Sequence, residues 1–103
     1  PAWALASYEE AVRLDPQNPQ LYGLLGGVYY EQKKYDIAIT YFKKSIALKN
    51  DYENGYYNLA WAYFENNQIK EATNTMQLAI NLLPKNSPER AKAEKELETF
   101  IKP

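Results

Sequence analysis

The sequence predicts an all-α fold, because three observations agree. Residues of matching size recur every 34 positions, their spacing within each copy is helical, and no stretch alternates polar and apolar residues as a half-buried strand does. The 103 residues are 46% hydrophobic and carry a formal net charge of -1. That composition suffices for the core of one small domain and provides no bulk attraction to nucleic acid or an anionic membrane.

The repeat is visible as columns of equivalent residues. Six columns span three copies: Ala4, Ala38 and Ala72; Tyr8, Phe42 and Met76; Ala11, Ser45 and Ala79; Val12, Ile46 and Ile80; Leu14, Leu48 and Leu82; Pro16, Asn50 and Pro84. Five more columns span two copies: Tyr22 and Tyr56, Leu25 and Leu59, Gly26 and Ala60, Tyr29 and Tyr63, Tyr35 and Ile69. A fixed period of this length is typical of proteins built from stacked supersecondary units.

Each copy contains two amphipathic helices. Tyr22, Leu25, Gly26 and Tyr29 follow the i, i+3, i+4, i+7 spacing of one helix face, and prolines or polar runs interrupt the pattern between helices. The predicted helices span residues 2–14, 20–33, 36–49, 53–66, 69–82 and 88–101. The connections are short, so neighbouring helices are expected to pack antiparallel.

The last helix differs in composition from the others. It begins with Ser87 as N-cap and Pro88 in the first turn, and its apolar residues form one narrow stripe among lysines and glutamates. This composition favours a helix that covers the final repeat and faces water on its other side. A partner-binding helix is the alternative.

Composition also argues against an enzyme, a cofactor or a metal site. The chain has no cysteine and no histidine, so thiolate nucleophiles, imidazole bases and the commonest metal ligands are missing. The glutamates are expected on solvated helix faces, without a pocket or a histidine partner. Five lysines lie within residues 33–49, but the intervening Asp36 and the overall charge of -1 favour a solvated face over a nucleic-acid site.

Membrane and targeting signals are not apparent in this sequence. No run of 18 apolar residues occurs, and the chain begins with Pro1 without a basic and then apolar leader, so we predict no direct membrane insertion. We expect the chain to be a segment of a longer protein with further repeats upstream. Its location stays open between the cytoplasm and a membrane-tethered parent protein.

The repeat resembles the tetratricopeptide repeat family. The family pattern is an aromatic followed by x2-Leu-Gly-x2-Tyr, then Ala-x3-Phe and a proline, at a period of 34. One copy reads Tyr22, Leu25, Gly26, Tyr29, Ala38, Phe42 and Asn50; the next reads Tyr56, Leu59, Ala60, Tyr63, Ala72, Met76 and Pro84; the first retains Ala4, Tyr8 and Pro16. The resemblance predicts a single domain, residues 1–103, divided into a second half-repeat (1–18), two full repeats (19–52 and 53–86) and a capping helix (87–103).

The resemblance implies a right-handed superhelix of antiparallel helix pairs, whose first helices line a concave groove that holds a peptide or protein segment. The residues on those helices that intra-repeat packing does not use are the expected contacts, beside a depression at Gly23 and Gly27. The predicted groove residues are Tyr30, Asn54, Tyr57, Asn58, Trp61 and Phe64. Some family members clamp a chaperone C-terminus with lysine and asparagine, whereas Gly23 and Gly27 stand at the corresponding positions here.

Two alternatives to peptide binding remain at this point. We expect the aromatic residues Tyr57, Trp61 and Phe64 to be exposed. In the first alternative, they pack against the adjoining helix and are not available to a peptide. The chain would then be a structural end segment that stacks on upstream repeats or self-associates. Because the first helix lacks its repeat partner, Trp3, Leu5 and Tyr8 are the predicted self-association surface.

Overall fold

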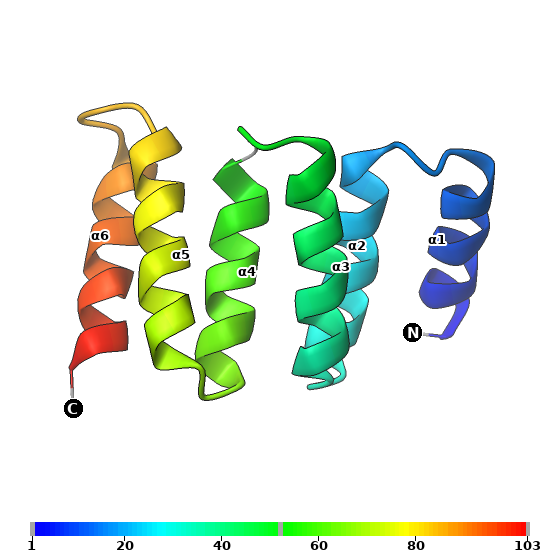
Figure 1. Ribbon diagram of the computed structural model, residues 1–103, viewed down its shortest axis with the longest axis horizontal. Coiled ribbons are helices and arrows are strands. Elements are labelled where there is room, and N and C mark those ends of the chain that lie inside the picture. Colours follow the sequence, from blue (N-terminus) through cyan, green and yellow to red (C-terminus); the bar gives the residue numbers. More distant parts are fainter. Residues whose placement is uncertain (1, 52, 103) are drawn as a thin grey trace.

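The computed structural model describes residues 2–51 and 53–102, which form six α-helices and no strand (Figure 1). The helices are α1 (Ala2–Leu14), α2 (Pro19–Glu31), α3 (Tyr35–Leu48), α4 (Glu53–Glu65), α5 (Ile69–Leu82) and α6 (Pro88–Ile101). The all-α prediction is therefore confirmed. Three helices have the predicted bounds, and α2, α3 and α4 differ by one or two residues.

The helices follow one another along the 39 Å long axis of the molecule, each antiparallel to the one before (Figure 1). The pairs α2–α3 and α4–α5 are the two full copies of the repeat. Helix α1 packs on α2, and α6 packs on α5, so one unpaired helix lies at each end. This order is the one that short connections and a helix-pair repeat require.

The turns inside the repeats explain where α2 and α4 end. Lys33 has a φ of 62° and Asn67, 34 positions later, has a φ of 64°. A left-handed residue stops an α-helix and lets the following backbone N–H groups bond to the last carbonyls. The predicted extension of the second helix to residue 33 is wrong for this reason, because the chain leaves the helix after Glu31.

The helix starts use the signals seen in the sequence. The Asn18 side chain accepts a hydrogen bond from the Gln20 backbone N–H at 3.0 Å, and Ser87 Oγ accepts one from the Arg90 N–H at 3.1 Å. A proline follows each cap at the first helical position. These caps satisfy backbone donors that have no partner within the helix.

The repeat columns are the core. Ala38 and Ala72 are fully buried and Ala4 is 5% exposed, as expected of small residues where helices cross closely. Gly26 is tighter still, because a Cβ built there would lie 2.5 Å from Cε1 of Phe42. In the next copy Ala60 replaces the glycine and Met76 replaces the phenylalanine. A larger residue on one helix is therefore matched by an unbranched, more flexible side chain on the helix that it crosses.

The leading tyrosine of each repeat has a second role. The Tyr22 hydroxyl donates to the Pro16 carbonyl at 2.9 Å, and the Tyr56 hydroxyl donates to the Asn50 carbonyl at 2.9 Å. The two donors are 34 residues apart in the sequence, and so are the two acceptors. The tyrosine therefore ties each repeat to the loop before it, while its ring packs in the core or at its edge.

Within the described residues, no helix is both long enough and apolar enough to cross a bilayer.

Candidate peptide-binding groove

Gly27 lies at the centre of a hollow that α1, α2 and α4 share. A Cβ added at Gly27 would meet no atom within 4 Å, and one added at Gly23 would come no closer than 3.8 Å, to Ser45 Oγ. Two glycines one turn apart on α2 thus remove side-chain volume from one face of the helix. The sequence predicted this depression, and the structure has it.

The hollow contains two adjoining pockets. The central pocket, of about 290 Å³, is lined by Gly27, Tyr30, Glu31, Phe42, Tyr57, Asn58 and Trp61. The N-terminal pocket, of about 650 Å³, is lined by Trp3, Ala4, Tyr8, Gly23, Leu24, Gly27, Val28, Glu31, Gln32 and Asn58. Because Gly27, Glu31 and Asn58 line both, the two pockets form one continuous hollow across α1, α2 and α4.

A third pocket extends this surface toward α6. The C-terminal pocket, of about 250 Å³, is lined by Asn54, Tyr57, Leu83, Glu89 and Lys92. Tyr57 lines both this pocket and the central one. We refer to the three pockets together as the groove; its walls are mainly aromatic, aliphatic and amide groups, which is typical of surfaces that bind peptides.

Trp61 and Phe64 are held by the last helix. The Phe64 ring stacks on Phe100 at 4.5 Å between centroids, and Trp61 meets Phe100 edge-on at 4.9 Å. Both side chains are half-buried, so the expectation that they are exposed is wrong. The reason is that α6 brings Phe100, itself 2% exposed, against α4. Trp61 still lines the central pocket, whereas Phe64 lines none of the three.

Tyr57 connects the groove to the same helix. Its hydroxyl lies 2.8 Å from Oε1 and 2.9 Å from Oε2 of Glu96 and donates to that carboxylate. Burial, and then the hydrogen bond to Glu96, raise the pKa of the Tyr57 phenol above its usual value. Tyr57 is half-buried, not exposed as expected, and its orientation is set by α6.

Tyr30 forms the wall on the α2 side. Its ring meets Tyr35 edge-on with a centroid distance of 5.3 Å. Burial, followed by the negative charge of Glu65, raises the pKa of Tyr30 to about 12. The phenol therefore stays protonated at neutral pH and can donate or accept one hydrogen bond within the groove.

The two predicted asparagines are the accessible polar groups. Asn54 and Asn58 are exposed, one turn apart on α4. Asn54 lines the C-terminal pocket, and Asn58 lies where the central and N-terminal pockets meet. An amide carries both a donor and an acceptor, so each side chain can bond to the backbone of an extended peptide.

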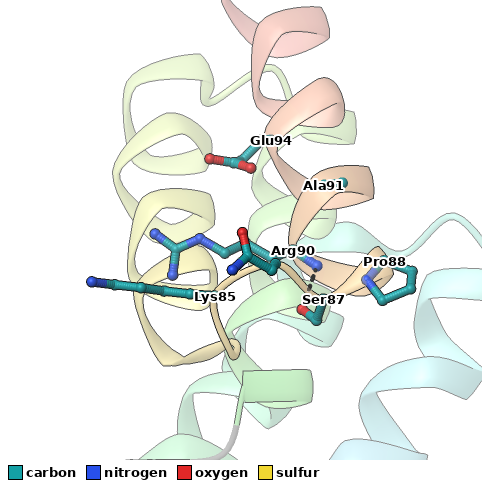
Figure 2. Close-up of a pocket in the computed structure, with 7 residues that line it drawn as sticks. Lys85, Ser87, Pro88, Arg90, Ala91 and Glu94 are labelled. Atoms are coloured by element: carbon teal, nitrogen blue, oxygen red, sulfur yellow. Dashed lines mark hydrogen bonds between the residues drawn. The ribbon is translucent and has the colours of Figure 1, made fainter.

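A separate pocket of about 510 Å³ lies at the turn between α5 and α6 (Figure 2). Figure 2 shows the Ser87–Arg90 cap bond beside the side chains of Lys85 and Glu94. Arg90 Nη1 donates to the Leu83 carbonyl at 3.1 Å, so its guanidinium helps to cap the end of α5. This pocket does not share a residue with the groove.

No three carboxylates among the described residues are placed to hold a metal ion.

Prediction from sequence missed part of the lining. Val28 and Leu24 on α2, Trp3 and Tyr8 on α1, and the α6 residues line the pockets but were not among the predicted contacts. Glu31 was expected on the face of its helix that intra-repeat packing leaves free, but it was not among the six predicted groove residues; it lies 34 positions before Glu65, and each of these residues ends the first helix of a repeat.

Comparison with known proteins places this geometry in context. The tetratricopeptide repeat family model matches residues 29–97, and a second model of the TPR repeat matches residues 3–33. The BBSome complex member BBS4 homolog of Drosophila melanogaster is 30% identical over 84 residues, which is 82% of this chain and 17% of that protein. The chain thus spans less than a fifth of that relative.

Solved structures share the fold. The first TPR of Spaghetti (RPAP3), bound to the HSP90 peptide SRMEEVD, is 25% identical with a TM-score of 0.84, covering 93% of this chain and 73% of that one. The O-GlcNAc transferase of Thermobaculum terrenum is 21% identical with a TM-score of 0.83, covering 94% of this chain and 18% of that one. Since one family model covers more than half of the chain and the repeat columns pack as that family's pattern requires, the chain belongs to the tetratricopeptide repeat family.

Proposed function

We propose that this chain is a protein-interaction module that holds a peptide or protein segment in the groove. The observation that carries the proposal is the continuous hollow at Gly27, joined to the C-terminal pocket through Tyr57. A protein of this size rarely leaves such a connected, partly apolar surface open without a use for it.

The comparisons support the class of ligand. The TPR of Spaghetti that resembles this chain binds a short peptide. The likeness to the O-GlcNAc transferase concerns the fold and 18% of that chain, so it supports no catalytic role for this segment. The predicted absence of enzyme activity stays part of the proposal.

The proposed contacts follow from the geometry. Tyr30, Asn54, Tyr57, Asn58 and Trp61 are retained as groove residues because they line its pockets. Phe64 has a different role: it holds Trp61 in place from behind, together with Phe100. The proposed division into a half-repeat (1–18), two repeats (19–52 and 53–86) and a capping helix (87–103) assigns the groove to the first helix of each full repeat and its neighbours.

The proposal is tested by filling the hollow. Gly27→Leu places a branched side chain in open space, so it should leave the fold intact and remove peptide binding. The matched control is Ala47→Leu, which adds the same side chain at an exposed position outside the groove. The ligand source is a library of random peptides of about ten residues, long enough when extended at about 3.3 Å per residue to follow most of a 39 Å molecule.

Peptides selected on the unmodified protein would be resynthesised and their Kd measured by fluorescence anisotropy. We expect binding to the unmodified protein and to Ala47→Leu, and at least a tenfold weaker Kd for Gly27→Leu. Equal affinity for all three proteins would show that the groove is not the binding site.

A second candidate function is self-association through the α1 end. Trp3 is 71% exposed and Leu24 is 44% exposed, and both line the N-terminal pocket. With the half-buried Tyr8, which lines the same pocket, they form an apolar patch on the first two helices; Leu5 is half-buried and does not line this pocket. Sedimentation velocity over a range of concentrations tests this: we expect association that Trp3→Ser reduces, whereas a monomer at every concentration excludes it.

A further inference from the structure

The charge in the central and N-terminal pockets comes from one residue. Among the described residues that line the central and N-terminal pockets, Glu31 is the one charged side chain, and it lines both. It is exposed, and it makes no hydrogen bond or ion pair with another described side chain within 4.0 Å. Its carboxylate is therefore available to a ligand at the centre of the hollow.

The location of Glu31 in its helix strengthens the negative potential. It is the last residue of α2, at the negative end of the helix dipole, and no basic residue lies in that last turn. Helix α4 ends in the same way at Glu65. A glutamate at a helix C-terminus is unfavourable because its carboxylate is repelled by the negative end of the helix dipole. Residues that are locally unfavourable in this way are expected at functional sites.

The neighbouring phenol responds to this potential. Glu65 and Glu31 both contribute, after burial, to the raised pKa of Tyr30, because negative charges oppose the formation of a phenolate. Both carboxylates therefore act on the Tyr30 phenol, which lines the central pocket.

Basic residues lie elsewhere on this surface. Lys33 and Lys34 line a different pocket, at the turn before α3, beside Asp36. Lys92 lines the C-terminal pocket together with Glu89. Among the described residues, no lysine or arginine lines the hollow, so an acidic peptide would find no cation there and would meet Glu31.

The walls of the central pocket suit a cation as well. Tyr30, Tyr57 and Trp61 surround the space beside Glu31. Aromatic rings attract an ammonium or guanidinium group and also the aliphatic stem that carries it. An apolar side chain would fit beside it, against Trp3, Leu24 and Val28 of the N-terminal pocket.

We propose that the groove selects a peptide segment that carries a lysine or arginine next to a bulky apolar residue, with the cation placed against Glu31. The inference rests on the proposed function and adds the chemical class of the ligand. The peptide SRMEEVD, which the structural relative binds, also has an arginine next to a methionine, but its three acidic residues would meet Glu31, so we expect this chain to bind it less tightly than a peptide without them.

Library selection with the unmodified protein tests the composition of the ligand. Recovered peptides should be enriched in lysine and arginine, and their affinity should fall as salt rises, because exposed charge pairs are screened. Glu31→Gln should weaken these peptides roughly twofold to fivefold and remove most of the salt dependence. Glu31→Lys should weaken them about tenfold or more.

The matched control is Glu98→Lys, which makes the same charge change at an exposed residue outside the groove and should leave the affinity unchanged. Two defined probes complete the comparison: SRMEEVD and SRMKKVK, in which lysine replaces each of the three acidic residues. The second should bind the unmodified protein more tightly, and the order should reverse for Glu31→Lys.

The outcomes separate the two proposals. Selected peptides without lysine or arginine enrichment, or tighter binding of SRMEEVD, would overturn the charge selectivity and leave the binding function intact. Recovery of no peptide would overturn both. Self-association that Gly27→Leu abolishes, in a protein that binds no peptide, would assign the groove to a second copy of the chain and overturn this inference.

Discussion

Helices α1 and α5 occupy the same place in the repeat but differ in burial. Their equivalent residues are 68 positions apart: Ala4 and Ala72, Tyr8 and Met76, Ala11 and Ala79, Val12 and Ile80. In α5 all four are at most 1% exposed, whereas in α1 only Ala4 is buried and the other three are half-buried.

The difference lies in the neighbours. Helix α5 packs between α4 and α6, whereas α1 packs mainly on α2. A repeat column therefore specifies which residue type suits a helix crossing. The adjacent helices determine how much of that side chain is buried. In a solenoid this makes the stabilising free energy depend on position along the array, even when the motif is the same.

The largest expected effect comes from uncovering the C-terminal end. Phe100→Ala should lower the free energy of unfolding by about 3 to 5 kcal/mol, because it removes a buried ring and leaves a cavity beside Trp61 and Phe64. Urea unfolding followed by circular dichroism measures the loss.

The control lies at the opposite end. Trp3→Ala removes a side chain that is 71% exposed, and should change the unfolding free energy by about 0.5 kcal/mol or less in the monomer. Similar losses for the two variants would mean that the ends are equally covered and would remove the basis of the comparison.

The same substitution in one column sharpens the contrast. Ala79→Leu should overpack a fully buried crossing and cost roughly 1 to 3 kcal/mol. Ala11→Leu adds the identical side chain at the half-buried equivalent, where it can extend toward solvent, and should be nearly neutral. Thermal melts of both variants give the comparison; an equal loss in both would show that α1 is packed as α5 is.

The crossing inside the first full repeat tests how size is matched. Gly26→Ala should cost roughly 1 to 3 kcal/mol, because its Cβ would lie 2.5 Å from the buried Phe42 ring. The adjacent Gly27→Ala is the control: it meets no atom within 4 Å and should stabilise the helix by about 0.4 to 1 kcal/mol.

A second substitution should restore the first. Gly26→Ala combined with Phe42→Met reproduces the Ala60 and Met76 pair of the next repeat, so the double variant should be more stable than the sum of the two single changes predicts. Additive losses would mean that the two repeats differ in backbone geometry and not only in side-chain volume.

The smallest expected effect is a pH dependence at the centre of the array. Tyr30 has a pKa of about 12 in the folded chain, above its usual value of 10. Between these values the unfolded state binds fewer protons than the native state, so this contribution to stability is complete below pH 10 and is lost as pH rises toward 12. The free energy of unfolding of Tyr30→Phe should therefore fall less steeply with pH between pH 10 and pH 12 than that of the unmodified protein.

Absorbance titration of the phenolates provides the measurement. The titration of Tyr30→Phe should lack one phenol that ionises near pH 12 in the unmodified protein. If the missing phenol instead ionises near pH 10, the assigned burial of Tyr30 is wrong.

Helix positions were predictable from sequence because proline, capping residues and the apolar period act locally. The ends of α2 and α4 were less accurate, since Lys33 gives no sign in the sequence that it adopts a left-handed conformation. The candidate site was predicted in part. Asn58 and the hollow at Gly27 follow from helix spacing, whereas the half-buried state of Trp61 and Phe64 depends on Phe100, more than 35 residues away in the chain.

The sequence by itself determined the family, the order of helices and the residue types at each crossing, because a 34-residue period repeats the same local packing rule. Only the tertiary structure decided which of these residues line a groove and which fill the core. That distinction depends on the neighbouring helix. Helix α6 covers Phe64 and holds Tyr57, whereas nothing described covers Trp3. Glu31 becomes the charged group of the hollow because α2 ends beside the aromatic residues of α4.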